Sequence, residues 1–219
     1  MLIRALPLVA GCAPIIGVTL AYWLAIDNAV LPACMPLLDG CVSISATGRY
    51  PPGSRVFRAI MLPQSVLLVF VWYFAAAWLR DISPTSRAPG TLIASGIVGA
   101  LALVLYVTFL GTKAPFYEIM RRFGIYIYFL GTAIAQLTLA IALLRTARPL
   151  KGAAIAMLWL CGLPFALGVL NLTLKALLDN ADSAENRIEW ISAILMQFYF
   201  VALYFAWRIS NFSVAVKTH

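Results

Sequence analysis

The sequence is poor in histidine and in charged residues. Its single histidine is His219, the last residue, and only 11% of the 219 residues are charged. Haem ligation by histidine pairs and hydrolysis at a histidine-bound zinc both need imidazoles in or near the fold, so neither is expected. No Walker loop or dinucleotide fingerprint occurs, and we predict no cofactor and no metal site. The scarcity of charge also sets the chain apart from ordinary soluble domains.

Long apolar runs dominate the chain instead, with 63% hydrophobic residues and a mean hydropathy of +0.94. About 20 apolar residues carry a helix across the hydrocarbon core of a bilayer. Six runs approach or exceed this length, at residues 5–26, 59–79, 91–111, 123–144, 152–174 and 190–207. They predict an all-α polytopic transmembrane bundle of six helices, forming a single domain over residues 1–219, with one longer outer loop after the first helix. No run contains a charged residue, so proton-coupled transport through a buried carboxylate is not expected.

The charges of the loops predict the orientation of the bundle. With the N-terminus in the cytoplasm, the inner and outer segments carry eight basic residues each, so the basic count alone does not decide. The inner segments contain one acid, Asp81, and the other seven acids fall on the outer side. We therefore predict cytoplasmic N- and C-termini and an extracytoplasmic first loop. The net charge of +8 does not indicate nucleic-acid binding, because no basic stripe with interleaved aromatic residues lies outside the spans.

A few polar and small residues within the spans carry packing information. The amide side chains there are Gln64, Gln136, Asn171 and Gln197. Hydrogen bonding across helices is their simpler interpretation, and a polar lining for a cleft is the alternative. Small residues four positions apart let helices approach closely, and they occur as Gly17 with Ala21, Ser95 with Gly99, and Gly131 with Ala135.

The first loop contains two cysteines, Cys34 and Cys41, with turn-forming Met35-Pro36 and Asp39-Gly40 between them. In an oxidising compartment a disulfide between them is the natural use, and two unpaired thiols are the alternative. The remaining cysteines, Cys12 and Cys161, fall inside spans and are interpreted as buried small apolar residues.

The loop continues with the polar segment CVSISATGRYPPGSRVFR, from Cys41 to Arg58. The alternation from Val42 to Ser45 predicts a short extended piece, and Ser54 is placed to cap the second helix. Arg55 and Arg58, three residues apart, share a helical face just above the membrane. Hydroxyls, helix N-terminal N–H groups and paired arginines can hold a phosphate. Anchoring of the arginines among lipid headgroups, without a specific site, is the simpler alternative.

A second basic cluster lies on the same predicted side. It consists of Lys113, Tyr117, Glu118, Arg121 and Arg122, where the spacing permits a Glu118 salt bridge to either arginine. An anchoring collar for the neighbouring helices is the simpler interpretation. If both clusters converge, they form one basic bowl suited to an anionic headgroup.

The polar segment resembles the first-loop hallmark of the Frag/DRAM/Sfk family, which groups the FGF-receptor-activating protein, the damage-regulated autophagy modulators and yeast Sfk. The hallmark is carried in order by Ser43-Ile44-Ser45, Ala46, Gly48, Pro51-Pro52 and Phe57-Arg58. The resemblance implies a six-span fold and a lipid-linked role, without a catalytic residue set. Arg49 stands where an acidic or neutral residue is more usual, so a role specific to GPI anchors is not implied.

Together, these features predict an integral membrane protein that binds or organises lipids, anionic ones in particular, through its outer loop and without catalysis. The predicted headgroup-binding residues, which donate hydrogen bonds or pair charges with a phosphate, are Ser43, Ser45, Arg49, Arg55, Arg58, Arg121 and Arg122. A structural subunit or assembly factor with a protein partner in the membrane is the alternative. A lipid- or glycolipid-remodelling enzyme is the third hypothesis, although a serine without a histidine or lysine base is poorly activated.

Overall fold

The computed structural model describes residues 2–146, 148–178 and 180–213, which contain helices and no strand. Six long helices are α1 (Leu2–Asp27), α4 (Gly53–Ile82), α5 (Ala88–Phe109), α6 (Pro115–Thr146), α7 (Lys151–Leu177) and α8 (Asp182–Ile209). The first loop holds two short helices, α2 (Pro36–Asp39) and α3 (Ile44–Thr47), and a 3₁₀ turn, η1 (Arg148–Leu150), precedes α7. All six long helices are long and apolar enough to cross a membrane, which confirms the predicted all-α six-helix bundle.

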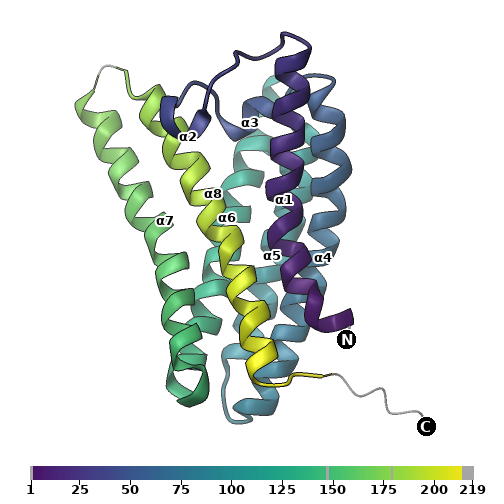
Figure 1. Cartoon of the computed structure of the whole chain (residues 1–219), viewed down its shortest axis with the longest axis vertical. Coiled ribbons are helices and arrows are strands. Elements are labelled where there is room, and N and C mark those ends of the chain that lie inside the picture. Colours follow the sequence, from purple (N-terminus) through teal and green to yellow (C-terminus); the bar gives the residue numbers. More distant parts are fainter. Residues whose placement is uncertain (1, 147, 179, 214–219) are drawn as a thin grey trace.

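The long helices pack as a ring in chain order, and α8 closes the ring against α1. Both ends of the described chain lie at the same end of the bundle, and the first loop with α2 and α3 lies at the other (Figure 1). Arg4 ties the two ends together. Its Nε donates to the carbonyl oxygen of Phe212 (2.5 Å) and its Nη2 to that of Asn211 (2.9 Å).

Several helices extend beyond the apolar runs that predicted them. The helix α8 begins at Asp182, well before the run that starts at Trp190, because Asp182 and Glu185 in its first turn favour the positive end of the helix dipole. The expectation that Ser54 caps the second span is wrong. Helix α4 already begins at Gly53, and Pro52 occupies the position before it without a side-chain cap.

Small residues bring α5 and α6 into backbone contact, as their spacing predicts. A Cβ atom placed on Gly131 would lie 2.7 Å from the carbonyl oxygen of Ser95 and 2.9 Å from the nitrogen of Gly99. The two small-residue pairs on α5 and α6 therefore pack against each other. Gly17 of α1 likewise approaches a neighbouring helix and lies against the side chain of Ile60 in α4.

Two of the four amide side chains join helices, as expected. Gln64 Nε2 donates to the carbonyl oxygen of Ala10 (2.7 Å), which links α4 to α1. Gln136 Nε2 donates to the carbonyl oxygen of Met196 (3.1 Å), which links α6 to α8. Such bonds satisfy amides that would otherwise lie unpaired in a low-dielectric interior.

Helix α7 is the least buried of the six. Its buried residues are Ala154, Met157 and Cys161, all in the half nearest η1. No residue of 162–177 is buried, and Cβ atoms added at Gly162 or Gly168 would meet nothing within 4 Å. Residues 162–177 of α7 thus have few packing constraints.

Candidate functional site

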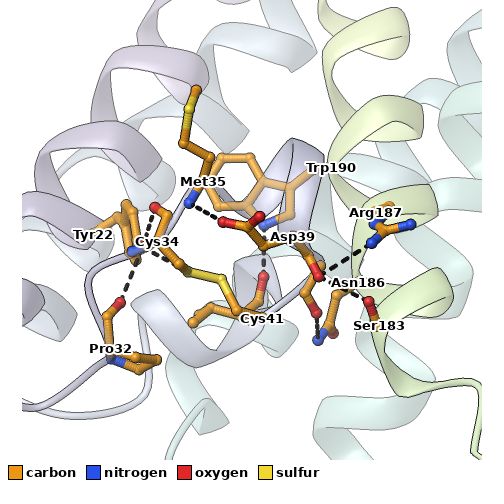
Figure 2. The surroundings of a disulfide bond; sticks show 12 residues. Tyr22, Pro32, Cys34, Met35, Asp39, Cys41, Ser183, Asn186, Arg187 and Trp190 are labelled. Atoms are coloured by element: carbon orange, nitrogen blue, oxygen red, sulfur yellow. Dashed lines mark hydrogen bonds between the residues drawn. A yellow bond between two sulfur atoms is a disulfide. The ribbon is translucent and has the colours of Figure 1, made fainter.

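The first loop is held together by a disulfide between Cys34 and Cys41, shown in Figure 2. The hydroxyl of Tyr22, near the end of α1, donates to the carbonyl oxygen of Cys34 (2.8 Å) and accepts from the Cys34 N–H (3.2 Å). The Asp39 carboxylate accepts from the Met35 N–H (2.8 Å) and so closes the turn of α2. These contacts fix the loop to the end of α1.

The same loop is seated on the first turns of α8 (Figure 2). Ser183 Oγ donates to the carbonyl oxygen of Asp39 (2.8 Å), Asn186 Nδ2 to that of Gly40 (2.8 Å), and Trp190 Nε1 to that of Val42 (2.9 Å). Gly40 has a φ of 64°, and a Cβ there would run into the backbone of Ser183. Glycine is required at this position for both reasons.

The predicted extended piece from Val42 to Ser45 is wrong, because Ser43 starts a helix. Its hydroxyl oxygen accepts the N–H of Ala46 (3.2 Å) as the cap of α3, and it lies 3.1 Å from the Ser45 hydroxyl. Capping satisfies an N–H that an extended strand would leave unpaired here. Ser43 and Ser45 are therefore brought together, and one of them keeps a hydroxyl hydrogen for another acceptor.

The Glu189 side chain of α8 contacts the first turn of α3. Its Oε1 accepts the N–H of Ser45 (3.3 Å), and the N–H of Ile44 also points to this carboxylate. Arg49 is close enough to act on it electrostatically. Within the part of the chain that the structure describes, the only salt bridge joins Lys175 to Glu185, so Glu189 has no cation within salt-bridge distance.

Three of the five predicted arginines gather around the end of α5 nearest the first loop. Arg58 Nη2 donates to the carbonyl oxygen of Leu110 (2.6 Å), and the backbone of Arg49 packs against Gly111, whose φ is 88°. The Nε atoms of Arg49 and Arg58 are buried without a hydrogen-bond partner. Both Arg49 and Arg121 act electrostatically on Tyr106, one turn before the end of α5.

Arg55 and Arg122 do not join this group. Both side chains are exposed, and neither makes a polar contact within the described ranges. The salt bridge that the spacing permits from Glu118 to Arg121 or Arg122 is not formed there either. Two N–H groups at the start of α4 are already bonded, since Ser54 N–H donates to the Tyr50 carbonyl oxygen (3.0 Å) and Arg55 N–H to that of Pro52 (3.1 Å).

A partly open cavity of about 290 Å³ lies between the helices, and Tyr106 is part of its lining. Leu37 of α2 and Ile44 of α3 line it from the first loop, and α1, α4, α5, α6 and α8 supply the walls. The lining is mostly apolar. Its polar side chains include Thr19, Tyr128 and Gln197, together with Tyr106.

Tyr106 joins the apolar cavity to the charged groups. It is 5% exposed, lines the cavity, and packs edge-on against Phe57 with ring centroids 6.5 Å apart. Arg49, Arg121 and Glu189 all act electrostatically on its hydroxyl, which has no hydrogen-bond partner among the residues described. The polar end of the cavity is therefore set by residues from the first loop, α5, α6 and α8.

The only group of residues in the described ranges with the spacing of metal ligands is Cys34, Asp39 and Cys41. Metals bind cysteine as the thiolate, and here the two sulfur atoms are bonded to each other. This group is thus part of the loop's framework.

Sequence reasoning missed Glu189, Tyr106 and Trp190 as parts of this site. Glu189 was counted among the loop acids because the apolar run begins one residue later, at Trp190. Tyr106 lies inside a run that is apolar on every face, and its hydroxyl gives no distinguishing pattern. The one sequence signal that points to Glu189 is its position directly before an apolar run, where a helix that begins earlier would include it.

Residues 3–209 match the family described as the Frag1/DRAM/Sfk1/Cwh43P N-terminal domain. The match covers nearly the whole chain and confirms the resemblance carried by the segment from Ser43 to Arg58. No curated protein and no solved structure matches the chain.

Proposed function

The chain belongs to the Frag1/DRAM/Sfk1/Cwh43P N-terminal domain family, and we propose that this integral membrane protein binds a phosphate-bearing lipid beneath its first loop, without catalysing a reaction on it. The proposal is carried by Tyr106, which lines the apolar cavity and on which Arg49 and Arg121 both act electrostatically. An apolar pocket with a few convergent polar groups at one end is the usual form of a ligand site. An amphiphilic ligand matches both parts of such a site, with its apolar chain in the pocket and its headgroup at the polar end.

The two halves of the site have separate roles. The cavity of about 290 Å³ receives part of an acyl chain, whose burial is favourable by about 25 cal/mol per Å² of apolar surface. Arg49 and Arg121 pair with the phosphate, and arginine suits this role because its planar donors match phosphate oxygens. Within the described ranges, Ser43 and Ser45 contact each other and no lysine, which supports a binding role for them in place of a nucleophilic one.

The arginines provide the first test. The double change Arg49→Gln with Arg121→Gln is expected to lower retained phospholipid at least about tenfold, since hydrogen bonds to charged groups contribute about 1.5–3 kcal/mol each. The measurement is native mass spectrometry of the gently solubilised protein. Arg58 is left intact because its bond to Leu110 supports the fold.

Arg55→Gln with Arg122→Gln is the matched control, because it removes the same charge from the same side of the bundle at exposed positions. It is expected to change lipid retention less than about twofold, as surface charges contribute little. Equal loss in both variants would show that the arginines act only as a general positive surface. Equal retention in both would end the proposal.

We propose that the first loop and this site face the extracytoplasmic side, with cytoplasmic N- and C-termini. Both ends of the described chain lie opposite the loop (Figure 1). A single acid, Asp81, offsets the basic residues on the side of the termini. A disulfide in the loop suits an oxidising compartment.

Thiol labelling tests the orientation and the disulfide together. In sealed right-side-out vesicles, a membrane-impermeant maleimide is expected to label the protein only after an impermeant reductant has opened the Cys34–Cys41 bond. Cys34→Ser with Cys41→Ser is the control and should stay unlabelled, because Cys12 and Cys161 lie within the helices. Labelling before reduction would contradict the disulfide, and labelling only after permeabilisation would contradict the orientation.

A structural subunit of a larger membrane complex is the second candidate, and the exposure of α7 favours it. No residue of 162–177 is buried, and Asn171 Oδ1 in this stretch has no hydrogen-bond partner in the described chain. A transmembrane helix of a partner protein would cover such a face. Co-purification of a stoichiometric protein partner, lost on Gly168→Leu, would favour this function.

A further inference from the structure

We propose that the site takes a zwitterionic phospholipid bearing a primary ammonium group, as an ethanolamine headgroup does, in preference to an anionic phospholipid. This inference rests on the proposed function and names the headgroup. It differs from the sequence-based expectation of an anionic lipid because the structure brings the Glu189 carboxylate near Arg49.

The ammonium group is assigned to Glu189. Its carboxylate is anchored from one side by the Ser45 N–H (3.3 Å), on a loop segment whose Ile44 lines the cavity. The next residue, Trp190, also lines the cavity. No cation within the described ranges lies at salt-bridge distance from Glu189. Burial without a paired cation disfavours the charged form of this carboxylate, and a cation supplied by a ligand stabilises it.

The phosphate is assigned to Arg49 and Arg121. Neither forms a salt bridge within the described part of the chain, although Glu189 lies near enough to Arg49 for an electrostatic interaction. The site therefore holds positive and negative groups that are close to one another and not paired. A ligand with one anionic and one cationic group compensates both, whereas a purely anionic headgroup leaves Glu189 uncompensated.

Tyr106 is the second observation that points to a ligand. Its side chain is 5% exposed and lines the cavity, and its hydroxyl has no hydrogen-bond partner among the described residues. A hydroxyl that lines a cavity without a protein partner is free to donate to a ligand. Placed between the cavity and the charged groups, it is positioned to donate to a phosphate or ester oxygen, where a lipid changes from polar to apolar.

A primary ammonium fits better than a quaternary one. Glu189 offers hydrogen-bond acceptors, and a primary ammonium has three N–H donors. A quaternary ammonium has none and is usually held by a cage of aromatic faces. The chemistry of Glu189 thus distinguishes ethanolamine from choline.

The test compares lipids with identical acyl chains by native mass spectrometry. The unmodified protein is expected to retain phosphatidylethanolamine about tenfold over phosphatidylglycerol, the amount expected for one charge-assisted hydrogen bond. Glu189→Gln is expected to bring this ratio close to one. The glutamine oxygen can still accept the Ser45 N–H, so the change removes the charge and keeps the anchoring bond.

Tyr106→Phe is the matched control, because it keeps the ring packing against Phe57 and removes only the hydroxyl. It is expected to lower retention of both lipids equally and to leave their ratio unchanged. Free phosphoethanolamine at equal concentration is expected not to displace the bound lipid, since it cannot use the cavity. Displacement by it would overturn the lipid as the source of the headgroup.

The outcomes separate this inference from the proposed function. A wild-type ratio near or below one, or a ratio unchanged by Glu189→Gln, would overturn the ethanolamine assignment. The proposed function would stand if Arg49→Gln with Arg121→Gln still lost phospholipid. No retention of any phospholipid would overturn both. Should Glu189→Gln not fold, the wild-type preference for phosphatidylethanolamine over phosphatidylcholine decides, and equal retention of these two would overturn the assignment.

Discussion

Replacing Gly131 with leucine is expected to force α5 and α6 apart and to lower the melting temperature on the order of 10 °C. Even a single methyl carbon at this position would lie 2.7 Å from the carbonyl oxygen of Ser95 and 2.9 Å from the nitrogen of Gly99. These are backbone atoms of a helix and cannot rotate away. Overpacking of this kind costs about 3 kcal/mol or more where the surroundings do not yield.

The control for this variant is Gly162→Leu. A Cβ there meets nothing within 4 Å, so the added side chain points away from the bundle and the melting temperature should stay within about 1 °C of the wild type. The melting temperatures of both variants are measured in detergent by heating samples and quantifying the remaining folded protein by size-exclusion chromatography. A Gly131→Leu protein as stable as the Gly162→Leu protein would refute the close α5–α6 contact.

Replacing Ala193 with phenylalanine is expected to abolish most lipid binding while leaving the bundle folded. Ala193 of α8 lines the cavity, and a ring there occupies space that the acyl chain needs. Excluding about 100 Å² of chain surface from burial costs about 2.5 kcal/mol, which is close to a hundredfold in affinity. The cavity of about 290 Å³ has room for the new side chain, so the fold should tolerate it.

Ala166→Phe is the matched control for the cavity variant. Ala166 is exposed on α7, and the same substitution there adds the same apolar surface without entering the cavity. Native mass spectrometry of both variants, beside their melting temperatures, separates loss of the pocket from loss of the fold. Lipid retained equally by a folded Ala193→Phe protein would show that the cavity does not hold the chain.

The first loop shows where sequence reasoning reached its limit. The Ser43–Arg58 segment identified the family, because its serines, glycine, prolines and arginine occur in the same order as in the family's first-loop hallmark. It could not say which arginines act together. Arg55 and Arg58 share a helical face by spacing, yet Arg55 is exposed and Arg58 reaches the Leu110 carbonyl oxygen. Their environments differ because the loop between α5 and α6 covers only one of them.

Helix boundaries were a second limit. Charge marks where a hydrophobic run ends, but a helix continues through polar residues as long as its N–H groups find partners. The run from Trp190 therefore belongs to a helix that starts at Asp182. This extension carries Glu189 under α3, where its carboxylate meets the Ser45 N–H.

The sequence by itself determined the number of spans, the all-helical class and the small-residue positions at which helices can approach closely. Length, hydrophobicity and residue size are local properties, and a bilayer leaves few other ways to satisfy the backbone. Only the tertiary structure decided that Arg49, Arg121 and Glu189 all act electrostatically on Tyr106, which lines one apolar cavity. They come from four separate segments, and their meeting depends on ring closure between α8 and α1 and on the seating of the first loop. Such contacts join residues far apart in the chain, and no local pattern records them.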